Sequence, residues 1–172
     1  LTRLGAGAAL AQRPPQGQPQ RPVDPLGGAF GVTEAAMPPA EAARQVEMMA
    51  AALTSLQPQR PGVVDTYILS VSFWNDPVFE AEAKEAAAIL ARRYDAPDRT
   101  IVLSAGRGGG AVRTYPAATP NNFQAALGKI GATIDPAEDL VIVFMTSHGG
   151  PDGTVALQEK DRMGGGLRVL PL

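Results

Sequence analysis

The sequence predicts an α/β protein built on a mostly parallel sheet. Apolar, β-branched segments alternate with segments of helical periodicity, in the order β-α-β-α-β. Such alternation favours parallel strands joined by right-handed crossover helices, with helices on both faces of the sheet. The length of 172 residues, with 45% hydrophobic and 19% charged residues, fits one soluble globular domain with a tail. We therefore expect a three-layer sandwich.

Composition excludes several classes of function. A net charge of −2 gives no basic surplus for nucleic acid or for an anionic membrane surface. The absence of cysteine excludes disulfides, thiolate metal sites and thiol catalysis by these residues alone. Any histidine-based site must use His148, and one histidine with scattered carboxylates is a weak zinc set. We expect neither a metal nor a cofactor.

The amino-terminal part predicts a leader remnant and a linker. Residues 1–11 are small and apolar and end in Ala-Leu-Ala, the A-x-A pattern of a signal-peptide cleavage site. An unstructured terminus and the end of a membrane anchor are the alternatives. We expect export to the periplasm or another extracytoplasmic compartment, with membrane contact through such an anchor alone. Residues 12–38 are rich in Pro, Gln and Gly, which predicts a linker.

The next segments predict an accessory helix (39–57) and the start of a domain spanning 62–172. Apolar residues at helical spacing predict a helix over Pro39–Leu56, whose buried face is Val46, Met49, Ala50, Leu53 and Leu56. Val63–Ser72 is β-branched and predicts a strand. Asp76-Pro77 opens a helix to about Tyr94, and the expected buried face is Phe79, Ala83, Ala86, Ile89 and Leu90, with Glu80 in solvent.

The second half predicts two further strands, a helix and a weaker strand. Thr100–Ser104 is a short strand, and residues 105–119 form a glycine-rich loop. Thr119 and Pro120 are a natural cap and first turn of a helix that stops at Gly131. Leu140–Thr146 is apolar without alternation, which predicts a strand buried on both faces. A weaker strand is expected at residues 153–158.

The sequence points to one site, at the end of the strand Leu140–Thr146. Ligands of parallel sheets bind beyond the carboxyl ends of the strands, and His148 lies there. A histidine can act as general base or acid, and the N–H of Gly149 can serve an oxyanion hole. Position alone gives equal weight to a histidine that merely caps the strand.

Four segments resemble the C13 (legumain-like) cysteine peptidases, in particular their bacterial branch. They are R-P-G-V-V-D-T-Y from Arg60, D-P-V-F from Asp76, T-P-N-N-F-Q-A-A-L from Thr119 and D-L-V-I-V-F-M-T-S-H-G from Asp139. The resemblance implies a caspase-like fold and proteolysis through a His/Cys dyad. His148 matches the family's catalytic histidine, and Gly149 matches the donor of an oxyanion-hole N–H. A cysteine would form a thioester with the substrate, which water then hydrolyses.

The sequence departs from that family in lacking the cysteine. We expect the amino-terminal part of a longer peptidase, inactive by itself and prone to self-association through an open sheet edge beside the histidine strand. One alternative is a catalytically inactive caspase-like binding or scaffolding module. Another is an unrelated hydrolytic or nucleotide-binding α/β domain.

Substrate recognition is predicted at the loops around His148, and the expected partner is a peptide or protein substrate. Legumains use a basic residue after the first strand, whereas this chain has Trp74 and Asn75 there, which puts preference for asparagine in doubt. Trp74, Asn75 and Ser147 are the candidate substrate-binding residues. An exposed loop aromatic packing on its neighbours is the alternative for Trp74. The run from Gly106 to Gly110 lacks the end of a phosphate-binding loop, which predicts a flexible loop.

Overall fold

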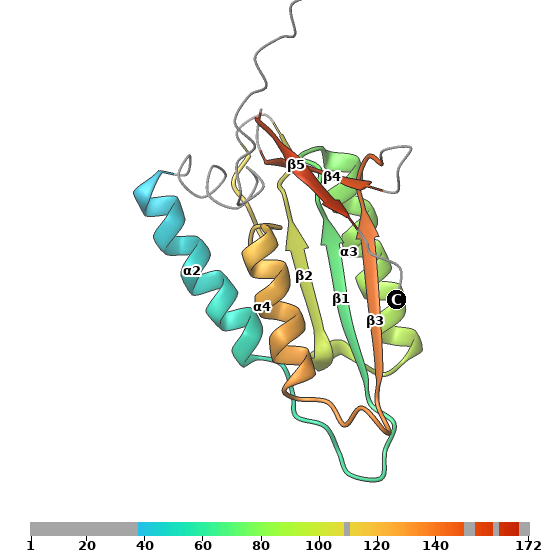
Figure 1. Cartoon of the computed structure of the whole chain (residues 1–172). Coiled ribbons are helices and arrows are strands. Elements are labelled where there is room, and N and C mark those ends of the chain that lie inside the picture. The colour runs from blue at the N-terminus through green and yellow to red at the C-terminus, as the bar shows by residue number, and fades with distance from the viewer. Residues whose placement is uncertain (1–37, 109–110, 150–153, 160–161, 169–172) are drawn as a thin grey trace, which may run out of the picture.

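The computed structural model of the protein describes residues 38–108, 111–149, 154–159 and 162–168 (Figure 1). The expected leader remnant (1–11) and all of the expected linker except Pro38 lie outside these residues. The helices are α2 (Pro39–Thr54), α3 (Pro77–Arg93), the 3-10 turn η1 (Pro97–Arg99) and α4 (Pro120–Gly131). The strands are β1 (Thr66–Ser72), β2 (Thr100–Ser104), β3 (Leu140–Thr146), β4 (Thr154–Glu159) and β5 (Arg162–Arg168).

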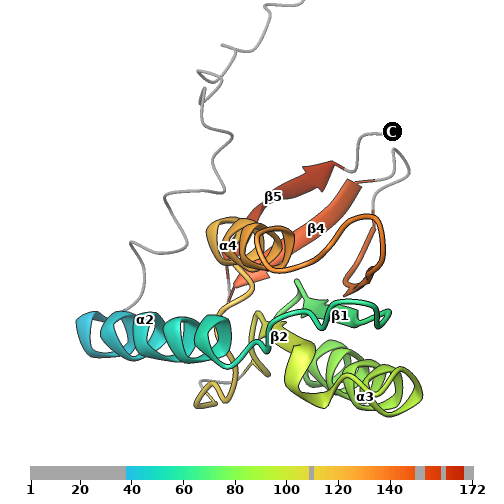
Figure 2. The same ribbon diagram turned by 90° about the horizontal axis from the view of Figure 1, so that it is seen from below.

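The first three strands form the predicted parallel sheet. Their order is β2-β1-β3, and both pairs are parallel. Helix α3 lies against one face and α4 against the other, as Figure 2 shows along the strands. Helix α2 runs beside α4, next to the β2 side of the sheet. The α/β class and the parallel sheet flanked by helices are thus confirmed.

The prediction that Leu140–Thr146 is buried on both faces is wrong. Strand β1 occupies the centre, and all seven of its residues are buried. Strand β3 is at the edge, and its side chains alternate between exposed and half-buried. An apolar run alone does not distinguish a central strand from an edge strand that lacks a cover on one face.

Two helices begin where their capping residues predict. The Asp76 carboxylate accepts a hydrogen bond of 2.9 Å from the Val78 N–H, and Pro77 is the first helical residue of α3. The Thr119 hydroxyl accepts one of 3.1 Å from the Asn122 N–H, ahead of Pro120 in α4. Each side chain satisfies a backbone donor that the first turn leaves without a partner.

The buried faces of α2 and α3 differ from the prediction. Val46 is 70% exposed and Ile89 is 47% exposed, whereas Gln45 and Glu80 are buried. Gln45 is buried because its side-chain oxygen accepts the Ala117 N–H at 2.7 Å. Hydrogen bonds to specific polar partners therefore rotate each helix about its own axis, away from the orientation that hydrophobicity alone favours.

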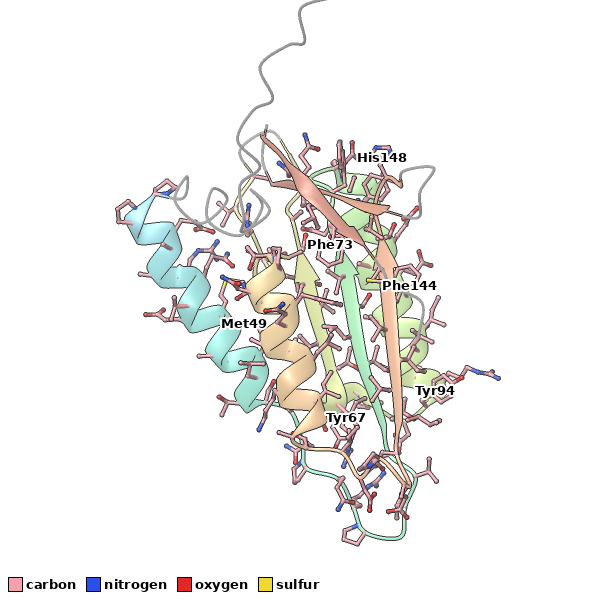
Figure 3. All side chains as sticks on the ribbon, in the orientation of Figure 1. Met49, Tyr67, Phe73, Tyr94, Phe144 and His148 are labelled. Atoms are coloured by element: carbon pink, nitrogen blue, oxygen red, sulfur yellow. The ribbon has the colours of Figure 1, made fainter. Side chains whose placement is uncertain are left out.

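The core lies between the sheet and the α2/α4 side. Tyr67, Leu69 and Val71 of β1 and Phe73, which follows it, are all at most 1% exposed. They pack with residues of β2, α4 and α2, namely Ile101, Leu103, Ala126, Ile130 and Met49. Figure 3 labels Tyr67, Phe73 and Met49 of this core. Each buried Leu, Ile, Val, Phe or Met side chain of this set contributes about 1.5–3 kcal/mol by leaving water.

An ion cluster holds the amino ends of the strands. The Asp65 side chain, which is 1% exposed, binds Arg60 at 2.6 Å and Arg99 at 3.4 Å. The Asp65 N–H donates to the Asp139 carboxylate at 2.9 Å, which fixes the start of β1 beside the start of β3. The hydrogen bond from the Arg60 side chain holds the pKa of Asp65 below its usual value, against the effect of burial.

Strands β4 and β5 form an antiparallel hairpin at the carboxyl end of the sheet, on the side of α4 (Figures 1 and 2). Strand β4 confirms the weaker strand expected at 153–158, whereas β5 is not predicted, because three consecutive glycines weaken its strand pattern. The Gln158 N–H donates to the Phe73 carbonyl at 2.8 Å, and Leu157 is buried in the core. The hairpin therefore closes the core above β1.

Candidate functional site at the carboxyl end of the sheet

The loops that follow β1 and β3 lie on either side of a reversal in the strand order. Strand β1 leads through α3 to β2 on one side, and β2 leads through α4, on the opposite face, to β3 on the other side. The strand order therefore reverses between β1 and β3, the switch point at which parallel sheets bind ligands. The segment Phe73–Asp76 follows β1 here, and Ser147–Gly149 follows β3.

The imidazole of His148 lies between two aromatic rings at this switch point. Its centroid is 4.6 Å from the Trp74 ring and 5.0 Å from the Phe79 ring, with interplanar angles of 88° and 78°. These are edge-to-face contacts, each worth about 0.5–1.5 kcal/mol. His148 is nevertheless exposed, and it lies at the carboxyl end of the sheet (Figure 3). The rings therefore restrict the orientation of the imidazole and leave it accessible to water.

The backbone after His148 turns back along β4. The Ala156 N–H donates to the His148 carbonyl at 2.8 Å, in the antiparallel bridge between Gly149 and Val155. In this type of bridge the hydrogen bonds come from the residues that flank the pair, so the Gly149 N–H does not point at Val155. The geometry is compatible with the predicted use of that N–H as a donor to a ligand.

Ser147 does not join the other candidate residues through its side chain. Its hydroxyl donates to the Ala156 carbonyl at 2.5 Å, and so attaches the loop to β4. Binding of substrate by Ser147 stays a prediction, and in this structure the hydroxyl has an anchoring role.

Asn75 links the loop after β1 to the loop after β2. Its side-chain oxygen accepts the Gly108 N–H, and the Cα of Gly106 lies so close that an added Cβ would be 3.2 Å from the same oxygen. Gly106 and Gly108 both have positive φ, at 105° and 73°, which side-chain-bearing residues rarely adopt. The glycine-rich segment here is a tight turn onto Asn75, while Gly109 and Gly110 lie outside the described residues.

A buried carboxylate that the sequence placed in solvent supports these loops. The Glu80 side chain is 6% exposed, accepts the Ser104 hydroxyl at 2.8 Å and pairs with Arg107 at 3.2 Å. Ser104 in turn accepts the Gly106 N–H at 2.9 Å and the Ser72 hydroxyl at 3.2 Å. Glu80 thus joins the first turn of α3 to the ends of β1 and β2. Burial raises the pKa of nearby Tyr115, and the negative charge of Glu80 adds to that effect.

The structure therefore brings Trp74 and His148 into contact. Asn75, the next residue along the chain from Trp74, instead binds the loop after β2. Sequence reasoning missed Phe79 as a partner of His148 and Glu80 as a buried anchor. The sequence contained a signal for both residues. Asp76 caps α3, so the first turn of α3 must lie at the carboxyl end of β1. Residues in that turn face the loops rather than the sheet alone.

Across the described residues, no three His, Cys, Asp or Glu side chains gather closely enough to hold a metal ion. Of the helices described, none combines the length and the apolar character needed to cross a membrane. Comparisons with protein-family models, with curated proteins and with solved structures give no match for this chain.

Proposed function

We propose that this chain is the amino-terminal part of a C13-type cysteine peptidase with a caspase-like fold, and that His148 is its general base and acid. The observation that carries the proposal is the position of His148: an accessible imidazole, oriented by Trp74 and Phe79, at the switch point of a parallel sheet. The resemblance of the segment ending in T-S-H-G supports the same role.

In this mechanism a cysteine attacks the scissile carbonyl of a peptide while His148 accepts the thiol proton. The Gly149 N–H stabilises the oxyanion that forms on the carbonyl oxygen. His148 then donates its proton to the departing amine, and water releases the acyl group in a second step. The cysteine must come from outside residues 1–172, because these contain none.

The proposal includes where the enzyme acts and what it binds. The A-L-A sequence before Gln12 supports export to an extracytoplasmic compartment. The substrate would be a peptide or protein whose side chain contacts the loop of Trp74 and Asn75.

The test begins with the gene downstream of Leu172. We expect a cysteine at the end of an apolar strand, and we expect the longer protein to hydrolyse fluorogenic peptides. His148→Ala should lower the rate of peptide hydrolysis by at least about 1,000-fold, which is the scale of the loss when a member of a catalytic triad is removed. The matched control is Glu47→Gln, at an exposed position on α2.

Two results would contradict the proposal. One is a downstream sequence without such a cysteine, which would favour the non-catalytic binding or scaffolding module. The other is peptide hydrolysis that His148→Ala leaves unchanged. The 172-residue chain itself is expected to be inactive in the same assay.

A further inference from the structure

The loop that follows β2 returns to β2 and extends the sheet by one short segment. In this return segment, residues 116–118, Ala117 forms a parallel bridge with Ser104. The Ser104 N–H donates to the Pro116 carbonyl at 2.9 Å, and the Ser104 carbonyl accepts from the Ala118 N–H at 3.1 Å. Backbone groups alternate in direction along an extended segment. The N–H and C=O of Ala117 therefore point away from β2.

Side chains from α2 and α4 bind both of these outward groups. The Gln45 side-chain oxygen accepts the Ala117 N–H at 2.7 Å, and the Asn122 side-chain amide donates to the Ala117 carbonyl at 2.9 Å. Gln45 is 6% exposed and Ala117 is 2% exposed, so removal of the Gln45 side chain leaves a buried backbone N–H unsatisfied. The return segment is thus held between β2 and the two helices.

The Gln45 amide has a fixed orientation. Its nitrogen donates to a Glu41 carboxylate oxygen at 3.0 Å, and the same oxygen accepts from the Arg44 guanidinium at 2.7 Å. Because the amide nitrogen is directed at Glu41, the amide oxygen faces Ala117. Another guanidinium nitrogen of Arg44 donates to the Arg113 carbonyl at 2.9 Å, so the first turns of α2 hold the loop at a second point.

The two halves of α2 make different contacts. Met49, Ala52 and Leu53, in the second half, contribute the apolar contacts of the helix with the core. The first half buries only Gln45. Helix α2 begins at the end of the molecule where the strands of the parallel sheet end, so its first half lies beside the loops of the candidate site (Figure 1). The polar contacts of this half are therefore made with a site loop rather than with the core.

The same loop holds the segment that carries Trp74. The Gly108 N–H donates to the Asn75 side-chain oxygen. Asn75 follows Trp74, whose ring centroid is 4.6 Å from that of the His148 imidazole. A continuous series of contacts therefore leads from α2, through the loop after β2, to the aromatic contact of His148.

We propose that Gln45 is a positioning residue of the candidate site, which makes the first half of α2 a functional part of that site. Gln45 fixes the return segment, and the loop then presents Gly108 to Asn75 in the position that keeps Trp74 against His148. The inference deepens the proposed function, and its effect on a substrate rests on that function, because Trp74 and Asn75 are the proposed substrate contacts.

Nuclear magnetic resonance of the 172-residue chain tests the positioning step without an activity assay. The sequence has one Trp and one His, so the indole N–H of Trp74 and the imidazole C–H groups of His148 are identified without ambiguity. In Gln45→Ala we expect these resonances to shift and the nuclear Overhauser effect between the two rings to weaken. The Ala117 amide should exchange with solvent about 10- to 100-fold faster.

Two control variants separate positioning from a general loss of stability. Gln124→Ala is the matched control, because Gln124 is exposed on α4. Ile130→Val removes a methylene from the core at the far end of α4, and so lowers stability without touching the loop. Both should leave the resonances of Trp74 and His148 unchanged. Circular dichroism checks that every variant is folded.

A pair of substitutions tests the hydrogen bonds of Gln45 and provides a milder change than alanine. Gln45→Glu keeps an acceptor for Ala117 but places a second carboxylate beside Glu41, so it should shift the ring resonances. The double variant Glu41→Gln/Gln45→Glu restores a donor between the two side chains and should return the resonances of Trp74 and His148 to near their original positions. Unchanged ring resonances in folded Gln45→Ala and Gln45→Glu would overturn the proposal, as would a double variant that resembles Gln45→Glu.

The longer peptidase provides a second test. Gln45→Ala should lower its kcat/KM for peptides by about 10-fold or more, because a small displacement of substrate-positioning groups is costly. An active peptidase whose kcat/KM is unchanged by Gln45→Ala would overturn the inference. A longer protein without peptidase activity would contradict the proposed function alone, since the ring resonances of the 172-residue chain still decide whether Gln45 positions the site.

Discussion

Replacement of Glu80 by alanine tests how the loops of the candidate site are held. The carboxylate is 6% exposed and accepts the Ser104 hydroxyl at 2.8 Å, a bond to a charged group worth about 1.5–3 kcal/mol. Its ion pair with Arg107 adds under about 1 kcal/mol, because the Arg107 side chain is 56% exposed. Glu80→Ala should therefore lower the free energy of unfolding by about 2–4 kcal/mol.

Urea denaturation followed by circular dichroism measures this loss. With a slope of about 2 kcal/mol/M, the midpoint should fall by about 1–2 M. Glu80→Gln keeps an acceptor for Ser104 and should lose about 1 kcal/mol, and Arg107→Ala should lose under about 1 kcal/mol. The reasoning fails if Arg107→Ala is as destabilising as Glu80→Ala, because the exposed pair would then dominate the buried hydrogen bond.

Three further predictions concern the sheet and its supports. Asp65→Asn should lower the free energy of unfolding by about 3 kcal/mol, measured in urea, since it leaves the nearly buried Arg99 without its anion. In the unmodified protein the pKa of Asp65 is lowered, so its stabilisation is present above pH 3.8 and lost as pH falls through the lower folded-state pKa; acid titration of Asp65→Asn should lack this loss. Leu69→Ala, at a fully buried position of β1, should lose about 2–5 kcal/mol by calorimetry, and Val143→Ala far less; equal losses would contradict the assignment of β3 to the edge. Thr119→Ala should lose about 1 kcal/mol in thermal unfolding, and Thr119→Ser should recover most of it.

The local rules of the sequence predicted the elements well. Strands β2 and β3 have the expected bounds, and α3 and α4 begin at their expected caps, Asp76 and Thr119. Proline after a capping residue is a short-range signal that does not depend on the rest of the fold. Alternation of strands and helices likewise predicted the parallel sheet, because few topologies satisfy it.

The failures concern neighbours that are distant in the chain. The exposure of β3 depends on which elements cover its two faces, and hydrophobicity does not encode that arrangement. Glu80 is buried because Ser104, 24 residues away, supplies a donor. At the site, the sequence placed His148 at the end of its strand, but its contact with Phe79 depends on how α3 crosses the sheet.

The pairing of β1 with β3 has a consequence for synthesis. Tyr67 lies opposite Val141, so 74 residues separate the two halves of this ladder. At about 5–20 residues per second, one side of β1 waits roughly 4–15 s for its neighbour to be translated. Throughout that interval an uncharged strand, made of residues that end up wholly buried, has one edge open on the nascent chain. Slow translation between Ser72 and Leu140 would lengthen this exposure, and a chaperone that binds extended apolar segments would cover the strand during it.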